Sequence, residues 1–83
     1  MSTVTDEEVR TTIARLVGAD PGDVTADVRL ESLVADSFAL VELAIGLQEE
    51  LDVVITQDDL REVTTVGQIC DVFRAASGRS HDG

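Results

Sequence analysis

Apolar residues recur at helical spacing in three separate stretches of this chain, and this pattern is the strongest constraint on its fold. In the first stretch, Thr5 and Glu8 have the spacing of a capping box, which marks the start of a helix. Gly18 follows the last apolar residue and offers a C-terminal stop. The pattern predicts a helix over residues 5–17, with an apolar face made of Val9, Ile13, Leu16 and Val17.

The second stretch predicts a central helix over residues 37–51 that has two different faces. At about 100° per residue, five side chains fall within one arc and form a core stripe: Leu40, Leu43, Ala44, Leu47 and Leu51. Five others point away from this stripe and mix apolar with acidic groups: Phe38, Val41, Glu42, Ile45 and Glu49. We call these five residues the outer face, and we interpret it as a surface on which other proteins dock.

The third stretch predicts a last helix over about residues 66–76, capped by Thr64 or Thr65. Thr56 is placed to cap a short helix over residues 57–62, which an extended link over residues 52–55 precedes. The apolar residues of the last helix are Val66, Ile69, Cys70, Val72, Phe73 and Ala76.

These elements predict an all-α fold: a small bundle of three main helices plus one short helix, with a long first loop over residues 18–36. The loop contains four apolar residues that we expect to pin it across the helices: Val24, Val28, Leu30 and Leu33. A chain of 83 residues suits one domain. We therefore expect a single domain over residues 1–83, with an ordered core at about residues 4–76 and a frayed tail at residues 77–83.

The net charge of the chain restricts the kinds of molecule that it can bind. The chain has 17 acidic and 6 basic residues, and its formal net charge is −11. Such a field repels nucleic acids and anionic lipid surfaces, and it attracts proteins with basic patches. No apolar stretch approaches the roughly 18 residues of a membrane span. The N-terminus is polar and acidic, so we expect no signal peptide. We expect a cytoplasmic protein that is a monomer.

The residues of common active and metal sites are scarce. Cys70 and His81 are single, which excludes a disulfide framework and multi-thiolate or multi-histidine metal sites. Cys70 also lies on an apolar stripe, where a buried thiol is expected. The acidic run that begins at Asp20 fails as a calcium loop, because Gly22 and Val24 occupy ligand positions and Thr25 stands where glycine is required. We therefore predict neither catalytic nor metal-binding residues, and a protein that is not an enzyme.

Ser37 lies where the long loop gives way to the central helix, and two interpretations are open. Either Asp36 or Ser37 caps the helix, as such residues commonly do. Alternatively, Ser37 is an attachment point, since a helix N-terminus offers free N–H groups and a positive dipole end to a phosphate ester. The two interpretations are compatible, because Asp36 can cap while Ser37 carries the ester.

The segment around Ser37 resembles acyl carrier proteins from about residue 30 to residue 73. The likeness rests on Ala35-Asp36-Ser37-Phe38, Val41-Glu42-Leu43, Leu47-Gln48-Glu49-Glu50-Leu51-Asp52, Ile55 and Val63-Thr64-Thr65-Val66. The resemblance implies a single carrier domain with 4′-phosphopantetheine on Ser37, beside Asp36. It implies that a phosphopantetheinyl transferase using Mg²⁺ donates this arm from coenzyme A, and that the arm holds acyl groups as thioesters.

The resemblance also implies the partners. The outer face would meet basic patches on the transferase and on a ketosynthase, an acyltransferase or ligase, and other biosynthetic enzymes. Val34, Phe38 and Gln48 depart from the common pattern, which favours a free-standing carrier for polyketide or specialised biosynthesis over housekeeping fatty-acid synthesis. Two alternatives remain: a peptidyl carrier, disfavoured because Leu33-Val34-Ala35 lacks glycine, and a non-carrier acidic helical adaptor.

Overall fold

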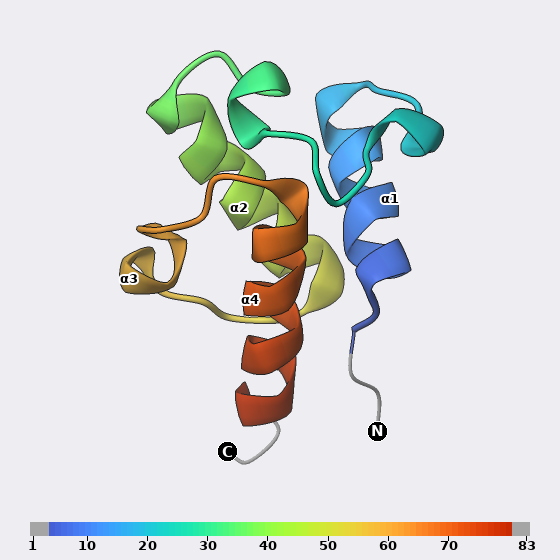
Figure 1. Cartoon of the computed structure of the whole chain (residues 1–83). Helices are drawn as coiled ribbons and strands as arrows, with labels where there is room; N and C mark the ends of the chain where they lie inside the picture. Colours follow the sequence, from blue (N-terminus) through green and yellow to red (C-terminus); the bar gives the residue numbers. More distant parts are fainter. Residues whose placement is uncertain (1–3, 81–83) are drawn as a thin grey trace.

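The computed structural model describes residues 4–80, which form a bundle of helices joined by one long loop (Figure 1). Its elements are α1 (Asp6–Val17), the 3₁₀ turns η1 (Pro21–Asp23) and η2 (Leu30–Ser32), α2 (Ser37–Leu51), α3 (Gln57–Leu60) and α4 (Val66–Ser80). Within this part of the chain no strand forms, and an isolated bridge joins Arg29 to Thr65. The predicted all-α fold, with three main helices and a short one, is confirmed.

The ends of α1 follow the predicted signals closely. The Thr5 hydroxyl accepts a hydrogen bond from the Glu8 backbone N–H at 3.1 Å, and the Glu8 carboxylate accepts one from the Thr5 N–H at 3.0 Å. At the other end Gly18 has a φ of 76°, a left-handed conformation that glycine adopts without steric cost. The predicted helix over residues 5–17 is therefore confirmed, with Thr5 as its N-cap.

The core lies where α1 packs against both α2 and α4. Its largest fully buried side chains include Ile13 of α1, Leu47 of α2 and Phe73 of α4. Leu16 is an exception to the predicted apolar face of α1, because 40% of it is exposed. It lies over Gly46 of α2, where an added Cβ would be 3.0 Å from Leu16 Cδ1, so it covers the surface of α2 and does not enter the core.

The first loop is fixed to the start of α4 by its backbone. The Val66 N–H donates to the Val28 carbonyl and the Gly67 N–H to the Ala26 carbonyl, each at 2.9 Å. These bonds satisfy N–H groups that a helix N-terminus leaves unpaired. Val24 is fully buried and Leu30 nearly so, whereas Val28 and Leu33 are half-buried, so the expected pinning of the loop is confirmed.

The predicted extended link over residues 52–55 was wrong at its first residue, because Asp52 is the C-cap of α2 in a left-handed conformation with a φ of 56°. Residues 53–55 follow it and form neither helix nor strand. Val53 and Ile55 are buried on one side, while Val54 is 74% exposed on the other. The prediction for α3 was too long, since the helix ends at Leu60 and not at residue 62. Residues 61 and 62 form a turn that brings the buried Val63 back towards the core.

The prediction for the last helix was too short. α4 begins at Val66, with the Thr65 hydroxyl accepting from the Gln68 N–H at 3.3 Å, but it continues to Ser80 and not to residue 76. Ser77 lies within the helix, and its hydroxyl accepts a hydrogen bond from the Val4 N–H at 3.2 Å. The tail predicted for residues 77–83 therefore does not begin at residue 77, and its last three residues, including His81, lie outside the described residues.

Candidate functional site

Ser37 is the first residue of α2, and Asp36 is the N-cap of that helix. The Asp36 Oδ1 accepts a hydrogen bond from the Ala39 N–H at 2.9 Å. The Ser37 side chain is exposed, and within residues 4–80 its hydroxyl has no hydrogen-bond partner. Of the two interpretations left open by the sequence, capping is thus performed by Asp36, and the Ser37 oxygen stays available for chemistry.

The electrostatics around Ser37 suit an anion. The first turns of α1 and α3 contain acidic side chains, whereas the first turn of α2 contains none. At this end of α2 the carboxylate is that of the N-cap Asp36, which accepts from the Ala39 N–H, and the first turn itself adds no further acid. A phosphate ester on the Ser37 oxygen would lie at this end of the helix, where such a group is stabilised.

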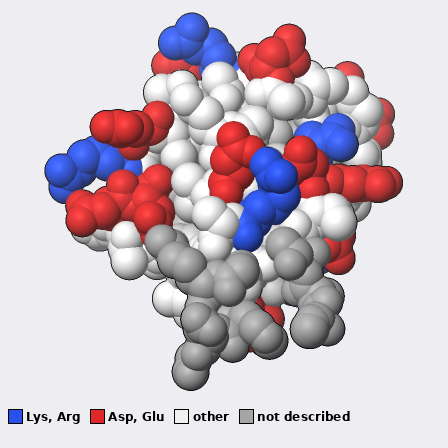
Figure 2. Space-filling model, turned by 60° about the horizontal axis from the view of Figure 1, so that its bottom comes forward, with Lys and Arg blue, Asp and Glu red and all other residues white. Residues whose placement is uncertain are grey.

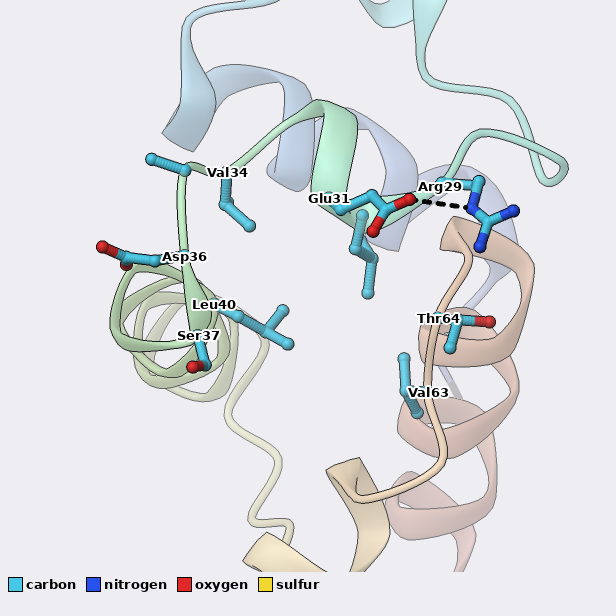
Figure 3. Close-up of a pocket in the computed structure, with 10 residues that line it drawn as sticks. Arg29, Glu31, Val34, Asp36, Ser37, Leu40, Val63 and Thr64 are labelled. Atoms are coloured by element: carbon cyan, nitrogen blue, oxygen red, sulfur yellow. Dashed lines mark ion pairs between the residues drawn. The ribbon is translucent and has the colours of Figure 1, made fainter.

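A pocket of about 340 Å³ opens beside Ser37. In Figure 3, Ser37 and Leu40 of α2 lie on one side and Val63 and Thr64 on the other, with Glu31 towards the upper edge. The full lining is Arg29, Leu30, Glu31, Val34, Ala35, Asp36, Ser37, Leu40, Val63 and Thr64. Sequence reasoning did not find this pocket, because its lining joins residues 29–40 to Val63 and Thr64, which are distant along the chain.

The outer face of α2 is exposed, as its angular position predicts. Phe38 is 70% exposed, Ile45 48% and Val41 39%. Glu42 and Glu49 are exposed as well, and neither forms an ion pair with any residue of the described chain. Since Leu16 lies over Gly46, α1 adds a further apolar side chain beside this face, a contribution that the periodicity of α1 did not indicate.

Three arginines of the described residues pair with acids that do not belong to the outer face. Arg15 contacts Glu50 at 2.9 Å, Arg61 contacts Asp58 at 3.1 Å, and Arg74 contacts Asp6 at 2.8 Å and also Asp71. Figure 2 shows basic groups beside acidic ones on the face that is lowest in Figure 1, the end at which α4 finishes. α2 begins at the opposite end, and none of these pairs neutralises the acids of its outer face.

The remaining reactive groups offer no second site. Cys70 is 2% exposed, and burial, with a smaller effect of the Asp6 carboxylate, raises the pKa of its thiol to about 11. Among the described residues, no group of three or more His, Cys, Asp or Glu side chains could hold a metal ion. No helix in the same part of the chain is long and apolar enough to cross a membrane.

A small helical bundle with an exposed serine at the start of its central helix, beside an exposed face of apolar and acidic side chains, is the arrangement expected of a carrier domain that bears a prosthetic arm. The family model described as "Phosphopantetheine attachment site" matches residues 7–73, and the chain belongs to this family. It is therefore a carrier of covalently attached 4′-phosphopantetheine, and its resemblance to acyl carrier proteins is confirmed. The exposed Ser37 hydroxyl and the adjoining pocket fit this group.

Proposed function

We propose that the protein is an acyl carrier of polyketide or specialised biosynthesis, and that Ser37 is the residue that bears its arm. The observation that carries the assignment of Ser37 is its exposed hydroxyl at the first position of α2, with the cap supplied by Asp36. A serine that capped the helix itself would have its oxygen engaged with backbone N–H groups.

In the loading step Ser37 acts as the acceptor. Its oxygen bonds to the phosphorus that carries pantetheine in coenzyme A, the bond to the second phosphate breaks, and 3′,5′-ADP leaves with the bonding electrons. The hydroxyl proton passes to a base of the transferase, which also supplies Mg²⁺. Asp36 positions the serine by fixing the first turn of α2, and the N–H groups of that turn stabilise the phosphodiester. The thiol of the bound arm supplies thioester chemistry.

The chain itself acts as a substrate and not as a catalyst. The outer face supports this role, because Glu42 and Glu49 are exposed and unpaired, and Val41 and Ile45 offer apolar contact beside them. Exposed charges raise association rates without making complexes tight. A carrier needs this combination, since it must visit a ketosynthase, an acyltransferase or ligase, and other enzymes, and must leave each of them.

The pathway assignment rests on Phe38 and Val34. Phe38 is 70% exposed directly after Ser37, and it offers partners a larger apolar contact than a smaller aliphatic side chain would. Val34 lines the pocket beside the attachment residue. Gln48, which the sequence also suggested as a partner difference, serves the fold, because its side-chain oxygen accepts a hydrogen bond from the Ile55 N–H at 3.0 Å.

Intact mass spectrometry tests the attachment. Incubation with coenzyme A, Mg²⁺ and a broad-specificity phosphopantetheinyl transferase should raise the mass by one phosphopantetheinyl group, and Ser37→Ala should abolish the gain. Ser32→Ala is the matched control, since Ser32 is an exposed serine in the same loop region and should leave the gain intact. An equal gain in Ser37→Ala would overturn the assignment of Ser37.

Loading of the holo-protein tests the class of cargo. We expect an acyltransferase or acyl ligase to charge the arm thiol, and an aminoacyl ligase to leave it uncharged. Charging by the aminoacyl ligase alone would make the protein a peptidyl carrier. If no transferase changes the mass of the folded chain while a control carrier is modified in the same reaction, the remaining interpretation is an acidic helical adaptor.

A further inference from the structure

Gly46 lies inside α2, where glycine is a poor helix former. A Cβ added at this position would lie 3.0 Å from Leu16 Cδ1, which is tighter than most contacts of that kind. The absence of a side chain at Gly46 therefore allows a leucine of α1 to lie directly on α2. Leu16 still reaches the solvent, because it is 40% exposed. α1 thus adds an apolar group to the exposed surface of α2.

With Leu16 in this position, the acids of the outer face lie between two apolar groups. At about 100° per residue, Glu42 and Glu49 lie about 40° and 60° around the helix from Gly46. Ile45 lies about 100° from Gly46 in the same direction. Since Leu16 covers Gly46, a line across this surface passes from Ile45 to the two carboxylates and then to Leu16. We call the outer face together with Leu16 the two-helix surface.

The position of Leu16 on α2 is supported by its neighbour in α1. Arg15 contacts Glu50 of α2 at 2.9 Å, which joins the two helices beside Leu16. The same contact pairs the charge of Glu50, whereas Glu42 and Glu49 stay unpaired within residues 4–80. A partner therefore meets a surface that is already arranged, and this lowers the entropy cost of binding.

The chemistry of the two-helix surface fits basic side chains. Arginine and lysine each have a long aliphatic stem and a charged head. When the head meets Glu42 or Glu49, the stem lies close to Leu16, which can cover it. An acidic partner is repelled by a net charge of −11, and a second copy of this chain would bring its own acids against these carboxylates.

We propose that Leu16 is a specificity-determining residue for the enzymes that recognise this carrier. They dock across both α1 and α2, and the stem of an arginine or lysine of the partner packs on Leu16 while its charge meets Glu42 or Glu49. The inference rests on the proposed function and extends the docking surface from one helix to two. A partner whose basic patch contacts α2 alone gains nothing from Leu16, so this residue favours partners whose patch spans both helices.

The rate of modification by a broad-specificity phosphopantetheinyl transferase tests this. Leu16→Ala should lower kcat/KM by about three- to tenfold, as expected for truncation of an interface contact. More than two turns of α2 separate Gly46 from Ser37, so the loss should arise from a higher KM and leave kcat unchanged. Leu16→Met keeps an apolar side chain of similar volume and should stay within about twofold of the wild type.

Val54→Ala is the matched control, because it truncates an apolar side chain that is 74% exposed and lies outside the two-helix surface. It should be modified at the wild-type rate. Circular dichroism at the assay temperature first shows that each variant is folded.

Double variants test the packing of a basic side chain on Leu16. Glu42→Gln and Glu49→Gln are each combined with Leu16→Ala. If one partner side chain contacts both the leucine and an acid, the two substitutions act on the same interaction. In at least one pair, the combined slowing should then fall about twofold or more below the product of the two single slowings.

The inference would be overturned if Leu16→Ala is modified as fast as the wild type, or if Val54→Ala is slowed equally. Leu16→Met as slow as Leu16→Ala would point to disturbed helix packing and would overturn it too, as would multiplicative slowing in both double variants. A wild-type chain that gains no phosphopantetheinyl group would instead contradict the proposed function. The two failures are therefore distinguishable by mass and rate.

Discussion

At the start of α2 two adjacent residues divide two tasks that either could have performed. Asp36 uses its carboxylate to satisfy the Ala39 N–H, and Ser37 keeps an exposed hydroxyl. The division matters because a capping oxygen is held against the helix and is a poor acceptor for an incoming phosphoryl group. Asp36 is therefore a positioning residue for the proposed attachment.

Replacement of the cap should lower stability. Asp36→Ala removes the acceptor of the Ala39 N–H, and we expect the free energy of unfolding to fall by about 1 kcal/mol. Asp36→Asn keeps a capping oxygen and should restore most of this loss. Urea denaturation followed by circular dichroism measures both variants. Equal stability of Asp36→Ala and wild type would show that the cap contributes nothing to the fold.

Cys70 should make the apo-protein unstable at alkaline pH. Burial raises the pKa of its thiol from 9.0 to about 11, so the unfolded chain loses the thiol proton before the folded chain does. The contribution of this thiol to the free energy of unfolding is therefore fully present below pH 9. It is lost as the pH rises to 11, by at most about 1.4 kcal/mol per pH unit. The chain has neither Lys nor Tyr, so few other groups titrate in this range.

Thermal unfolding between pH 8 and pH 11 measures this effect, with Cys70→Ala as the control. The variant should be less stable at neutral pH, because it loses a buried side chain, but its melting temperature should change little with pH. A parallel decline in both proteins would assign the alkaline instability to some other group.

At the scale of the helix, α2 contributes both to the core and to the proposed docking surface. Leu43, Ala44 and Leu47 are buried and hold the helix against α1, while the outer face remains exposed. Because the same helix carries Ser37, a protein that docks on the outer face is brought close to the arm. In the proposed function, one helix thus carries both the attachment residue and the recognition surface.

Reversal of one charge on the outer face should slow recognition. Glu42→Arg replaces an unpaired acid with a base, and we expect the transferase to modify it about three- to tenfold more slowly at low salt, with a smaller difference at high salt. Asp23→Arg changes the net charge equally but lies in the η1 turn. Equal slowing of both variants would show that net charge, and not the outer face, governs recognition.

The accuracy of the sequence-based prediction differed among the elements for physical reasons. α1 and α2 were predicted within a residue because local signals set their ends: a capping box and Gly18 for α1, and the Asp36 cap for α2. The ends of α3 and α4 depend on tertiary contacts, namely burial of Val63 and the bond from Val4 to Ser77, which no local pattern contains. The pocket beside Ser37 depends on contacts of the same kind.

At the scale of the whole molecule, charge is placed unevenly. The ion pairs of Arg15, Arg61 and Arg74 compensate acids on other parts of the surface, and they leave the outer face of α2 acidic. Arg29 is the arginine that lines the pocket beside Ser37. We therefore expect a net charge of −11 to attract basic partners to the molecule, and the unpaired acids of the outer face to favour α2 as the place where they bind.

The same charge should make the protein sensitive to salt. The body measures 34 × 24 × 20 Å, so at about 0.01 M salt, where the screening length is about 30 Å, most carboxylates repel one another across it. At about 0.15 M this length falls to about 8 Å. Screening also weakens the surface ion pairs, but each of these contributes only about 0–1 kcal/mol. Since acids outnumber bases 17 to 6, the loss of repulsion dominates, and the melting temperature should rise.

Calorimetry at the two salt concentrations measures this rise, which amounts to about 4–8 °C for each kcal/mol of repulsion removed. The control is the same comparison near pH 4.1, the isoelectric point, where the net charge vanishes and salt should have little effect. An equal rise at both pH values would point to a general action of salt on apolar burial. A melting temperature that salt leaves unchanged at pH 7 would show that the paired arginines already balance the repulsion, and that the acidity of this carrier serves recognition at no cost to its stability.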